Sequence, residues 1–359
     1  MQRRYGMAGG DKRIRVDDDG ADRISELPVH LREHILEYLY IWKAVATSVL
    51  SSKWRFCWTG LRKLQFDEDF WCVNLPLDHE RVIDRILLLH SGPIREFTLF
   101  IPEINYDTLD ITVWLRVLSN KGVQKIEIDA VEYHYKNMYY PIPSCLYHCR
   151  ELKELSLRGC KTTLPCEFKG FANLTSLSLD SVDIASSLLG SLISGCLLLE
   201  TLSLKDLRFQ KPLVLESLNL KTLYLYLDYC LKNIIFKDIP KLTCVSLLAT
   251  EAPDRIETPQ TYNTLDLFCS FSKIEELTID IFLLELDPEF RRGFESKSKV
   301  DYGEAAKLLE SEAKKYESYN SLQTIKIGGI AMLRHEILLI NLLQKCCPKL
   351  KSIGIKKWG

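Results

Sequence analysis

The chain has 359 residues, 47% of them hydrophobic, and a formal net charge of −1. It is too long for one compact core of ordinary size, so two domains or a repeat array are expected. The small net charge excludes a general attraction to nucleic acid or to anionic membranes.

The cysteines and the length of the longest apolar run indicate the cellular compartment of the protein. The 12 cysteines occur without an N-terminal secretory signal. The longest apolar run, around Leu188 to Leu199, is too short to span a bilayer. A reducing cytoplasmic or nuclear location is therefore expected, with cysteine as a small apolar filler. Residues 1–21 are rich in glycine and charge, and predict a disordered tail.

The first motif runs from Leu27 to Trp58 and reads LPVHLREHILEYLYIWKAVATSVLSSKWRFCW. Its first part predicts an amphipathic helix, because apolar residues recur every fourth position. The stripe consists of Leu27, Leu31, Ile35 and Leu39, and Leu36 widens it. Pro28 suits the first turn, where a missing N–H costs nothing.

Two further helices are predicted in the same block. The second begins at Lys43, with Val45, Val49 and Leu50 on one side. The third places Trp54 and Trp58, at i,i+4, on one face. So small a helical unit is marginal alone, so its surplus apolar face is predicted to be a docking surface.

This block resembles an F-box, the adaptor-binding module of Skp–cullin–F-box ubiquitin ligases, whose plant form reads LPxxIxxxILxxLPxKDAVRTSxLSxxWRxxW. The chain departs from that form where Tyr40 replaces Pro, Lys43 replaces Asp and Ala46 replaces Arg. The resemblance implies a Skp-type adaptor as partner, and through it cullin and RING subunits. The implied adaptor-binding residues are Leu27, Pro28, Leu31, Ile35, Leu36, Leu39, Val45, Val49, Leu50, Trp54 and Trp58.

One phrase then returns through the rest of the chain: apolar, two variable, apolar, one variable, apolar. It starts at residues 94, 123, 152, 174, 199, 220, 242, 274, 322 and 350. Most intervals lie in or near the roughly 20–29 residue period of leucine-rich repeats, whose strand phrase is LxxLxL. The expected fold is therefore α/β: a three-helix F-box followed by a solenoid, with parallel strands on its concave face and helices or turns on its convex face.

Two further features of the repeats carry predictions. Cys149, Cys196 and Cys347 share the slot three residues before the phrase, and are predicted to be structural filler. The asparagine of the usual repeat is absent; its position carries Cys160, Val182, Leu207 or Asp228, so a less regular curvature is expected.

The wider pattern is similar to plant F-box/leucine-rich-repeat proteins of the type that ends in an FBD domain. The expected domains are a tail (1–21), an F-box (22–66), a solenoid (67–319) and an FBD-like strand–helix–strand segment (320–359). The last segment also reads as a final repeat.

The variable residues of each strand phrase point out of the concave face, because side chains alternate along a strand. Small Ser and Thr residues are expected to form a smooth floor there. The candidate target-binding residues are Arg158, Asp180, Lys205, Tyr224 and Tyr226. Arg158, Lys205 and the two tyrosines are expected to make an aromatic-basic patch of the kind that anchors protein partners.

No catalytic residue, metal site or cofactor is predicted. No phosphate-binding glycine loop occurs, and His30 and His34 lack a third ligand. Cys145, His148, Cys149, Cys160 and Cys166 lie close in sequence, but not at the spacing of paired zinc ligands.

The expected function is the substrate-recognition subunit of a Skp–cullin–F-box ubiquitin ligase, a non-catalytic receptor. The alternative is a repeat scaffold that binds protein through a degenerate F-box without any ligase. A third class, a small-molecule receptor, requires a pocket in the concave groove, which the Ser and Thr floor does not suggest. The sequence does not identify the target.

Overall fold

The computed structural model describes residues 23–73, 78–130, 139–165, 167–207, 211–227, 234–249, 273–280, 321–328, 340, 344 and 347–356. The predicted tail and most of the helix predicted between residues 320 and 359 lie outside the described residues. The domain boundaries given above therefore stay predictions.

The N-terminal segment contains two of the three predicted helices. These are α1 (Val29–Glu37) and α2 (Ile41–Ala46), and a 3₁₀ turn (Thr47–Val49) extends α2. The segment of the third predicted helix instead forms successive turns that end in a 3₁₀ helix (Cys57–Gly60). Its backbone N–H groups bond three residues back, as Trp54 does to Ser51, so no α-helical turn closes.

All ten repeat phrases form strands, as predicted, and one more strand precedes them. Together these strands make an 11-stranded parallel sheet whose order follows the chain. The strands are β1 (Lys63–Phe66), β2 (Glu96–Ile101), β3 (Lys125–Ala130), β5 (Glu154–Arg158), β7 (Ser176–Asp180), β8 (Thr201–Lys205), β10 (Thr222–Leu227), β12 (Cys244–Ala249), β13 (Glu276–Asp280), β14 (Thr324–Gly328) and β15 (Ser352–Lys356). The strand order confirms the predicted solenoid.

Strand β1 was not predicted, although LRKLQF at Leu61 fits the repeat phrase. Leu61, Leu64 and Phe66 are buried like the leucines of later repeats. The sheet therefore begins inside the range predicted for the F-box, residues 22–66.

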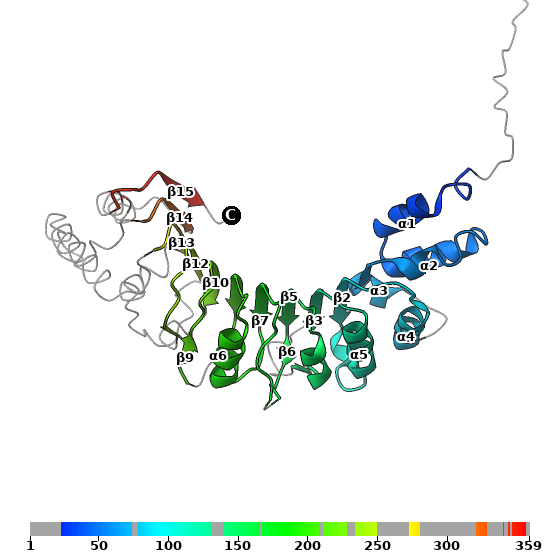
Figure 1. Cartoon of the computed structure of the whole chain (residues 1–359), viewed down its shortest axis with the longest axis horizontal. Helices are drawn as coiled ribbons and strands as arrows, with labels where there is room; N and C mark the ends of the chain where they lie inside the picture. Colours follow the sequence, from blue (N-terminus) through cyan, green and yellow to red (C-terminus); the bar gives the residue numbers. More distant parts are fainter. Residues whose placement is uncertain are drawn as a thin grey trace, which may run out of the picture.

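The sheet lies along the inner side of an arc, and helices lie on its outer side (Figure 1). The outer elements are α3 (Glu68–Cys72), α4 (His79–Leu89), α5 (Thr112–Asn120) and α6 (Ser186–Gly195), with 3₁₀ helices at Glu103–Asn105 and Ser144–His148. Two small parallel pairs join β4 (Tyr140–Pro141) to β6 (Cys160–Lys161) and β9 (Leu213–Leu215) to β11 (Ile234–Phe236). No helix in the described part of the chain is long and apolar enough to cross a membrane.

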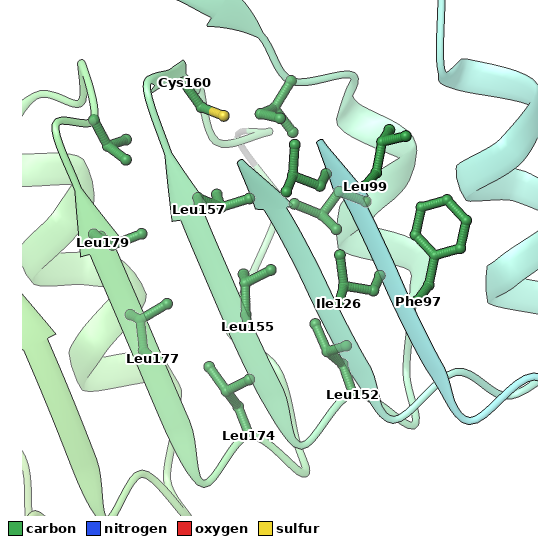
Figure 2. Packing of buried hydrophobic residues seen from close by; sticks show 14 of the residues in the cluster. Phe97, Leu99, Ile126, Leu152, Leu155, Leu157, Cys160, Leu174, Leu177 and Leu179 are labelled. Carbon is green, nitrogen blue, oxygen red and sulfur yellow. The ribbon is translucent and has the colours of Figure 1, made fainter. Parts of the chain in front are cut away.

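The core is a stack of equivalent leucines from successive repeats (Figure 2). Leu155 pairs in register with Leu177, and Leu157 with Leu179, and all four are at most 3% exposed. The cluster continues without a break into α1 and α2 through buried residues such as Leu36 and Ala44. Since α2 packs against β1, the N-terminal helices cover the first edge of the solenoid core.

Several strands are followed by a residue with a left-handed backbone conformation, at the point where the usual asparagine ladder would begin. Gly159, Ser181 and Asp206 have φ values of 62°, 52° and 50°. Their N–H groups donate to the next repeat: Gly159 to the Asp180 carbonyl at 3.0 Å and Ser181 to the Lys205 carbonyl at 2.9 Å. The next residues, Cys160, Val182 and Leu207, are buried. Apolar packing and these backbone bonds thus join the repeats where asparagine is absent.

Candidate interaction surfaces

Helix α1 turns its regular apolar stripe toward solvent. The exposed fractions of Leu31, Ile35 and Leu39 are 41%, 42% and 39%. Leu31 and Ile35 are one turn apart and share one face of α1, and Leu39 follows just after the helix ends. The adjacent face of the helix, with Arg32 and Leu36, is buried against the rest of the chain. About two fifths of each apolar side chain in the stripe is open to solvent, which is unusual for the apolar stripe of a helix in a globular domain.

Further exposed apolar side chains lie in the turns after α2. The exposed fractions are 87% for Val49, 61% for Leu50 and 64% for Phe56. Pro28 is exposed, and Leu27 and Val45 are half-buried. Eight of the eleven predicted adaptor-binding side chains are therefore at least partly accessible: Leu27, Pro28, Leu31, Ile35, Leu39, Val45, Val49 and Leu50.

The other three predicted adaptor-binding residues are buried in the chain itself. Leu36 is fully buried, and Trp54 and Trp58 are 2% and 4% exposed. The reason is that α1 packs over the 3₁₀ helix Cys57–Gly60, so the inner side of this segment fills the junction with the solenoid. The prediction that these three side chains contact an adaptor is wrong for this structure; they are core residues.

Arg32 links helix α1 to the turns that follow α2. Its side chain is buried, and its Nε donates to the Leu27 carbonyl at 3.1 Å, while a terminal nitrogen donates to the Lys53 carbonyl. Ser25 Oγ and Ser51 Oγ lie 2.8 Å apart and join the same two segments. These bonds fix α1 against the turns that present Val49, Leu50 and Phe56. Sequence reasoning missed this role of Arg32, whose only signal is its position four residues before the buried Leu36.

The departures from the F-box pattern leave the start of α2 intact. Tyr40 is the N-cap with φ −57°, a value that proline also adopts, so the backbone keeps the geometry that a proline would set. Its ring lies parallel to that of Trp42, with 6.4 Å between centroids. Lys43 Nζ lies 4.9 Å from the Trp42 ring centroid and 5.3 Å from that of Tyr40. This cation–π contact links Lys43 to the two rings at the start of α2.

On the concave face, the candidate target-binding residues fall into two neighbouring rows. Arg158, Asp180, Lys205 and Tyr226 are directly in register across β5, β7, β8 and β10. Tyr224 lies one row away, in register with Ser203, Ser178 and Ser156. The second row is the predicted hydroxyl floor, and it continues past Tyr224 to Ser246 and Thr278 on β12 and β13.

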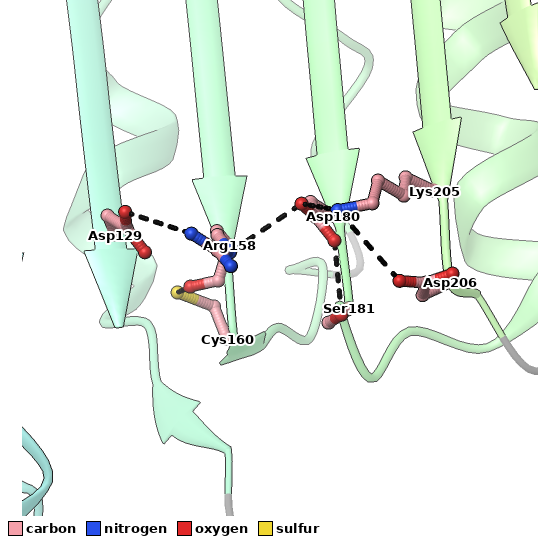
Figure 3. Close-up of polar contacts among 7 residues, drawn as sticks. All are labelled: Asp129, Arg158, Cys160, Asp180, Ser181, Lys205 and Asp206. Carbon is pink, nitrogen blue, oxygen red and sulfur yellow. Dashed lines mark hydrogen bonds and ion pairs between the residues drawn. The ribbon is translucent and has the colours of Figure 1, made fainter. Parts of the chain in front are cut away.

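The charges of the first row pair with one another (Figure 3). Lys205 Nζ lies 2.9 Å from Asp180 Oδ2 and 4.0 Å from Asp206 Oδ2. Arg158 lies between Asp129 and Asp180, with nitrogen–oxygen distances of 3.4 and 3.6 Å. The three carboxylates outnumber the two cations, so the expected basic patch is wrong: the row is a chain of ion pairs with a negative excess.

Among the described residues, which leave out Cys166, no group of three or more His, Cys, Asp or Glu side chains could hold a metal ion. Burial raises the pKa of Cys149 to about 12 and of Cys196 to about 11, and raises that of Cys160 further. Cys160 Sγ donates to the Arg158 carbonyl at 3.1 Å, and Cys145 Sγ to the Thr112 carbonyl at 3.5 Å. A thiol held protonated by burial is a poor metal ligand and a poor nucleophile. The burial of Cys149, Cys196 and Cys347 supports their prediction as filler.

Comparison with known proteins identifies the repeats. Residues 111–261 match the family model for the leucine-rich repeats of "FBD-associated F-box protein At5g56370". The chain is 39% identical over 236 residues to F-box/FBD/LRR-repeat protein At1g13570 of Arabidopsis thaliana. The aligned region covers 64% of this chain and 54% of that protein. It is 26% identical over 346 residues to F-box/LRR-repeat protein At3g59200 of the same plant, covering 92% of this chain and 62% of that protein.

The chain is similar to plant FBD-associated F-box/leucine-rich-repeat proteins, most clearly over its repeats. This confirms the resemblance seen in the F-box block and in the repeat phrase. The chain spans somewhat more than half the length of these two relatives. The structure thus shows an apolar helical face at one end and a polar concave face along the solenoid.

The structure also shows polar residues on the concave face that the sequence analysis did not single out. Asp129 ends its strand phrase at the position that Asp180 occupies two strands later. Asp206 directly follows Lys205. Both carboxylates were visible in the sequence, but their pairing depends on strand register, which a single sequence does not supply.

Proposed function

We propose that this chain is the substrate-recognition subunit of a Skp–cullin–F-box ubiquitin ligase in the cytoplasm or nucleus. Its F-box holds a Skp-type adaptor, and its concave face holds a protein target. The chain itself makes and breaks no bonds. It raises the effective concentration of the target's lysines near the ubiquitin-carrying subunit.

The observation that carries the proposal is the outward stripe of α1. Leu31, Ile35 and Leu39 keep helical spacing, yet they face solvent while Arg32 and Leu36 face the solenoid. Full removal of such a side chain from water contributes about 1.5–3 kcal/mol. Leu31, Ile35 and Leu39 are 39–42% exposed, so each has less than half of that left to gain on binding. The stripe and the exposed Val49 and Leu50 suffice for a stable adaptor complex after the cost of association.

The proposed target surface is the concave face of the solenoid. Two tyrosines next to a serine row offer aromatic anchors and hydroxyl groups, a combination common in protein-binding surfaces. The paired state of Arg158 and Lys205 favours a target recognised by shape and hydrogen bonds over one recognised by a phosphate group.

Reconstitution with purified subunits tests the proposal. Wild-type chain should co-purify with a Skp-type adaptor and, through it, with cullin. The double variant Leu27→Ala, Pro28→Ala should lose both partners and keep the circular dichroism of the repeats. Capture of the adaptor by this variant at the wild-type level would remove the assignment.

The alternative is a protein-binding scaffold without a ligase. Its support is the departure from the F-box pattern at Tyr40, Lys43 and Ala46. The geometry of Tyr40 argues against a degenerate helix, because α2 forms with an N-cap φ that proline shares. A wild-type chain that folds but binds none of several plant Skp-type adaptors would favour the scaffold.

A further inference from the structure

Two hollows lie on the convex side, beside α4 and α5. One of about 400 Å³ lies between these helices, and its floor and walls include Leu87, Leu88, Val113 and Val117. The other, of about 650 Å³, lies between α3, the start of α4 and the 3₁₀ helix Glu103–Asn105. Glu80 lines both hollows, so they meet at the first turn of α4. We refer to the two together as the convex groove.

The apolar part of the convex groove is open to solvent. The exposed fractions of Leu88, Val113 and Ile104 are 83%, 59% and 88%. The buried Trp114 closes the floor, and its Nε1 donates to Asp84 Oδ1 at 2.7 Å. This bond links α5 to α4. Exposed aliphatic side chains around a hollow whose floor is a buried aromatic ring are a feature of docking surfaces.

The polar lining of the convex groove is acidic. It holds six carboxylates and neither lysine nor arginine: Glu68, Asp78, Glu80, Asp84, Glu103 and Asp110. Arg81, outside the lining, lies 3.7 Å from Asp78 and offsets one of them. Burial, together with the charges of Asp78 and Asp84, raises the pKa of Glu80. Hydrogen bonds from Thr112, with the charge of Arg116, lower the pKa of Asp110, so Arg116 offsets a second carboxylate.

We propose that the convex groove binds a short amphipathic helix of another protein, with an aliphatic stripe on one side and lysine or arginine along its edges. The aliphatic stripe would pack on Leu88, Val113 and Val117, and the cations would face Glu80, Asp84 and Asp110. The 11 residues of α4 span about 16 Å, which matches about three turns of a partner helix. Helix-in-groove recognition combines these two kinds of contact.

Helices α4 and α5, which line the groove, lie on the side of the arc opposite the concave face (Figure 1), so its occupant and a concave-face target need not compete. The inference is independent of the adaptor proposal, because no residue of α1 or α2 lines the groove. Failure of one therefore leaves the other standing.

A labelled 14-residue peptide of leucine and lysine, with leucines at helical spacing, tests this inference by fluorescence anisotropy. Wild-type chain should bind it saturably and more weakly at high salt, and should not bind the matching leucine–glutamate peptide. Leu88→Ser and Glu80→Lys should each weaken binding at least tenfold. The matched controls are Leu89→Ser, on the same helix but outside the lining, and Glu167→Lys, an exposed carboxylate elsewhere; both should stay within twofold.

Other results overturn the inference. Absence of saturable binding, equal binding of the acidic peptide, or losses of the same size in the two controls would each do so. Loss of binding in Ile35→Ser would place the peptide on the F-box instead. A wild-type dimer in sedimentation that Leu88→Ser dissociates would assign the groove to a second copy of this chain.

Discussion

Lys205 Nζ lies 2.9 Å from Asp180 Oδ2 on the neighbouring strand, and both side chains are largely shielded from water. Asp180 also faces Arg158, so one carboxylate serves two cations from two repeats. The concave face is therefore held in one arrangement before any target arrives, which reduces the entropy that binding must overcome.

Asp180→Asn should destabilise the chain by about 1 kcal/mol, since it leaves two partly shielded cations with fewer partners. Urea unfolding followed by circular dichroism measures the change. Lys221→Gln is the matched control: it breaks the exposed 2.7 Å pair with Glu200, which should contribute less than about 0.5 kcal/mol. Equal effects of the two substitutions would show that sharing of Asp180 adds no stability.

Gly159→Ala should be costly because of the left-handed turn after β5. Gly159 has φ 62°, and an added Cβ would lie 2.1 Å from the Ala130 carbonyl oxygen. We expect a loss of about 2 kcal/mol or more, from the conformational penalty and the forced shift of backbone. Gly60→Ala, where the nearest atom is a flexible side-chain oxygen at 3.7 Å, should change the unfolding free energy little. A mild effect at Gly159 would mean that the turn is not rigid.

His90 predicts a pH dependence of stability at the junction of F-box and solenoid. Its ring is 3% exposed and contacts the carbonyl oxygens of Leu61 at 2.6 Å and Gly92 at 3.1 Å. Burial, assisted by the charge of Lys121, lowers its pKa in the folded chain. As the pH falls, His90 is therefore protonated in the unfolded chain before it is protonated in the folded chain. The contribution of neutral His90 to stability is complete above pH about 6.5 and is lost as the pH falls toward the folded-state pKa.

Unfolding free energies of wild type and His90→Gln at pH 8 and pH 5.5 measure this contribution. The wild type should lose more stability on acidification than the variant does. His30→Gln, at an exposed position of α1, should behave as the wild type. An unchanged pH dependence in His90→Gln would exclude His90 as its source.

The buried thiols should be chemically silent in the folded chain. Burial raises the pKa of Cys149 to about 12, whereas Cys72 is exposed. Brief iodoacetamide treatment followed by peptide mass spectrometry should label Cys72 and leave Cys149 and Cys196 unmodified until denaturant is added. Rapid native labelling of Cys149 would contradict its role as core filler.

Much of the solenoid was predictable because its signal is local and repeated. Each LxxLxL phrase specifies a strand with buried leucines, and the repeat period specifies that neighbouring phrases pair. The exposed stripe of α1 was also visible as a regular apolar spacing. Its outward direction follows from how α1 packs, and the sequence alone does not show that Leu36 faces inward while Ile35 faces solvent.

The features that sequence reasoning missed depend on contacts between distant residues. Trp54 and Trp58 have helical spacing, but the turns around them place both indoles in the core. Arg158 and Lys205 read as free cations until strand register brings carboxylates beside them. The convex groove has no sequence motif, because α3, α4 and α5 each contribute only part of it.

The central claim is that the outer face of the F-box segment needs another polypeptide to cover it. Titration calorimetry of a Skp-type adaptor with wild type and with Val49→Asp, Leu50→Asp measures this directly. These two residues are 87% and 61% exposed, so the substitutions should not disturb folding. The account predicts a negative heat-capacity change for the wild type and at least a hundredfold weaker binding by the variant. Equal affinities of the two chains for the adaptor would contradict it.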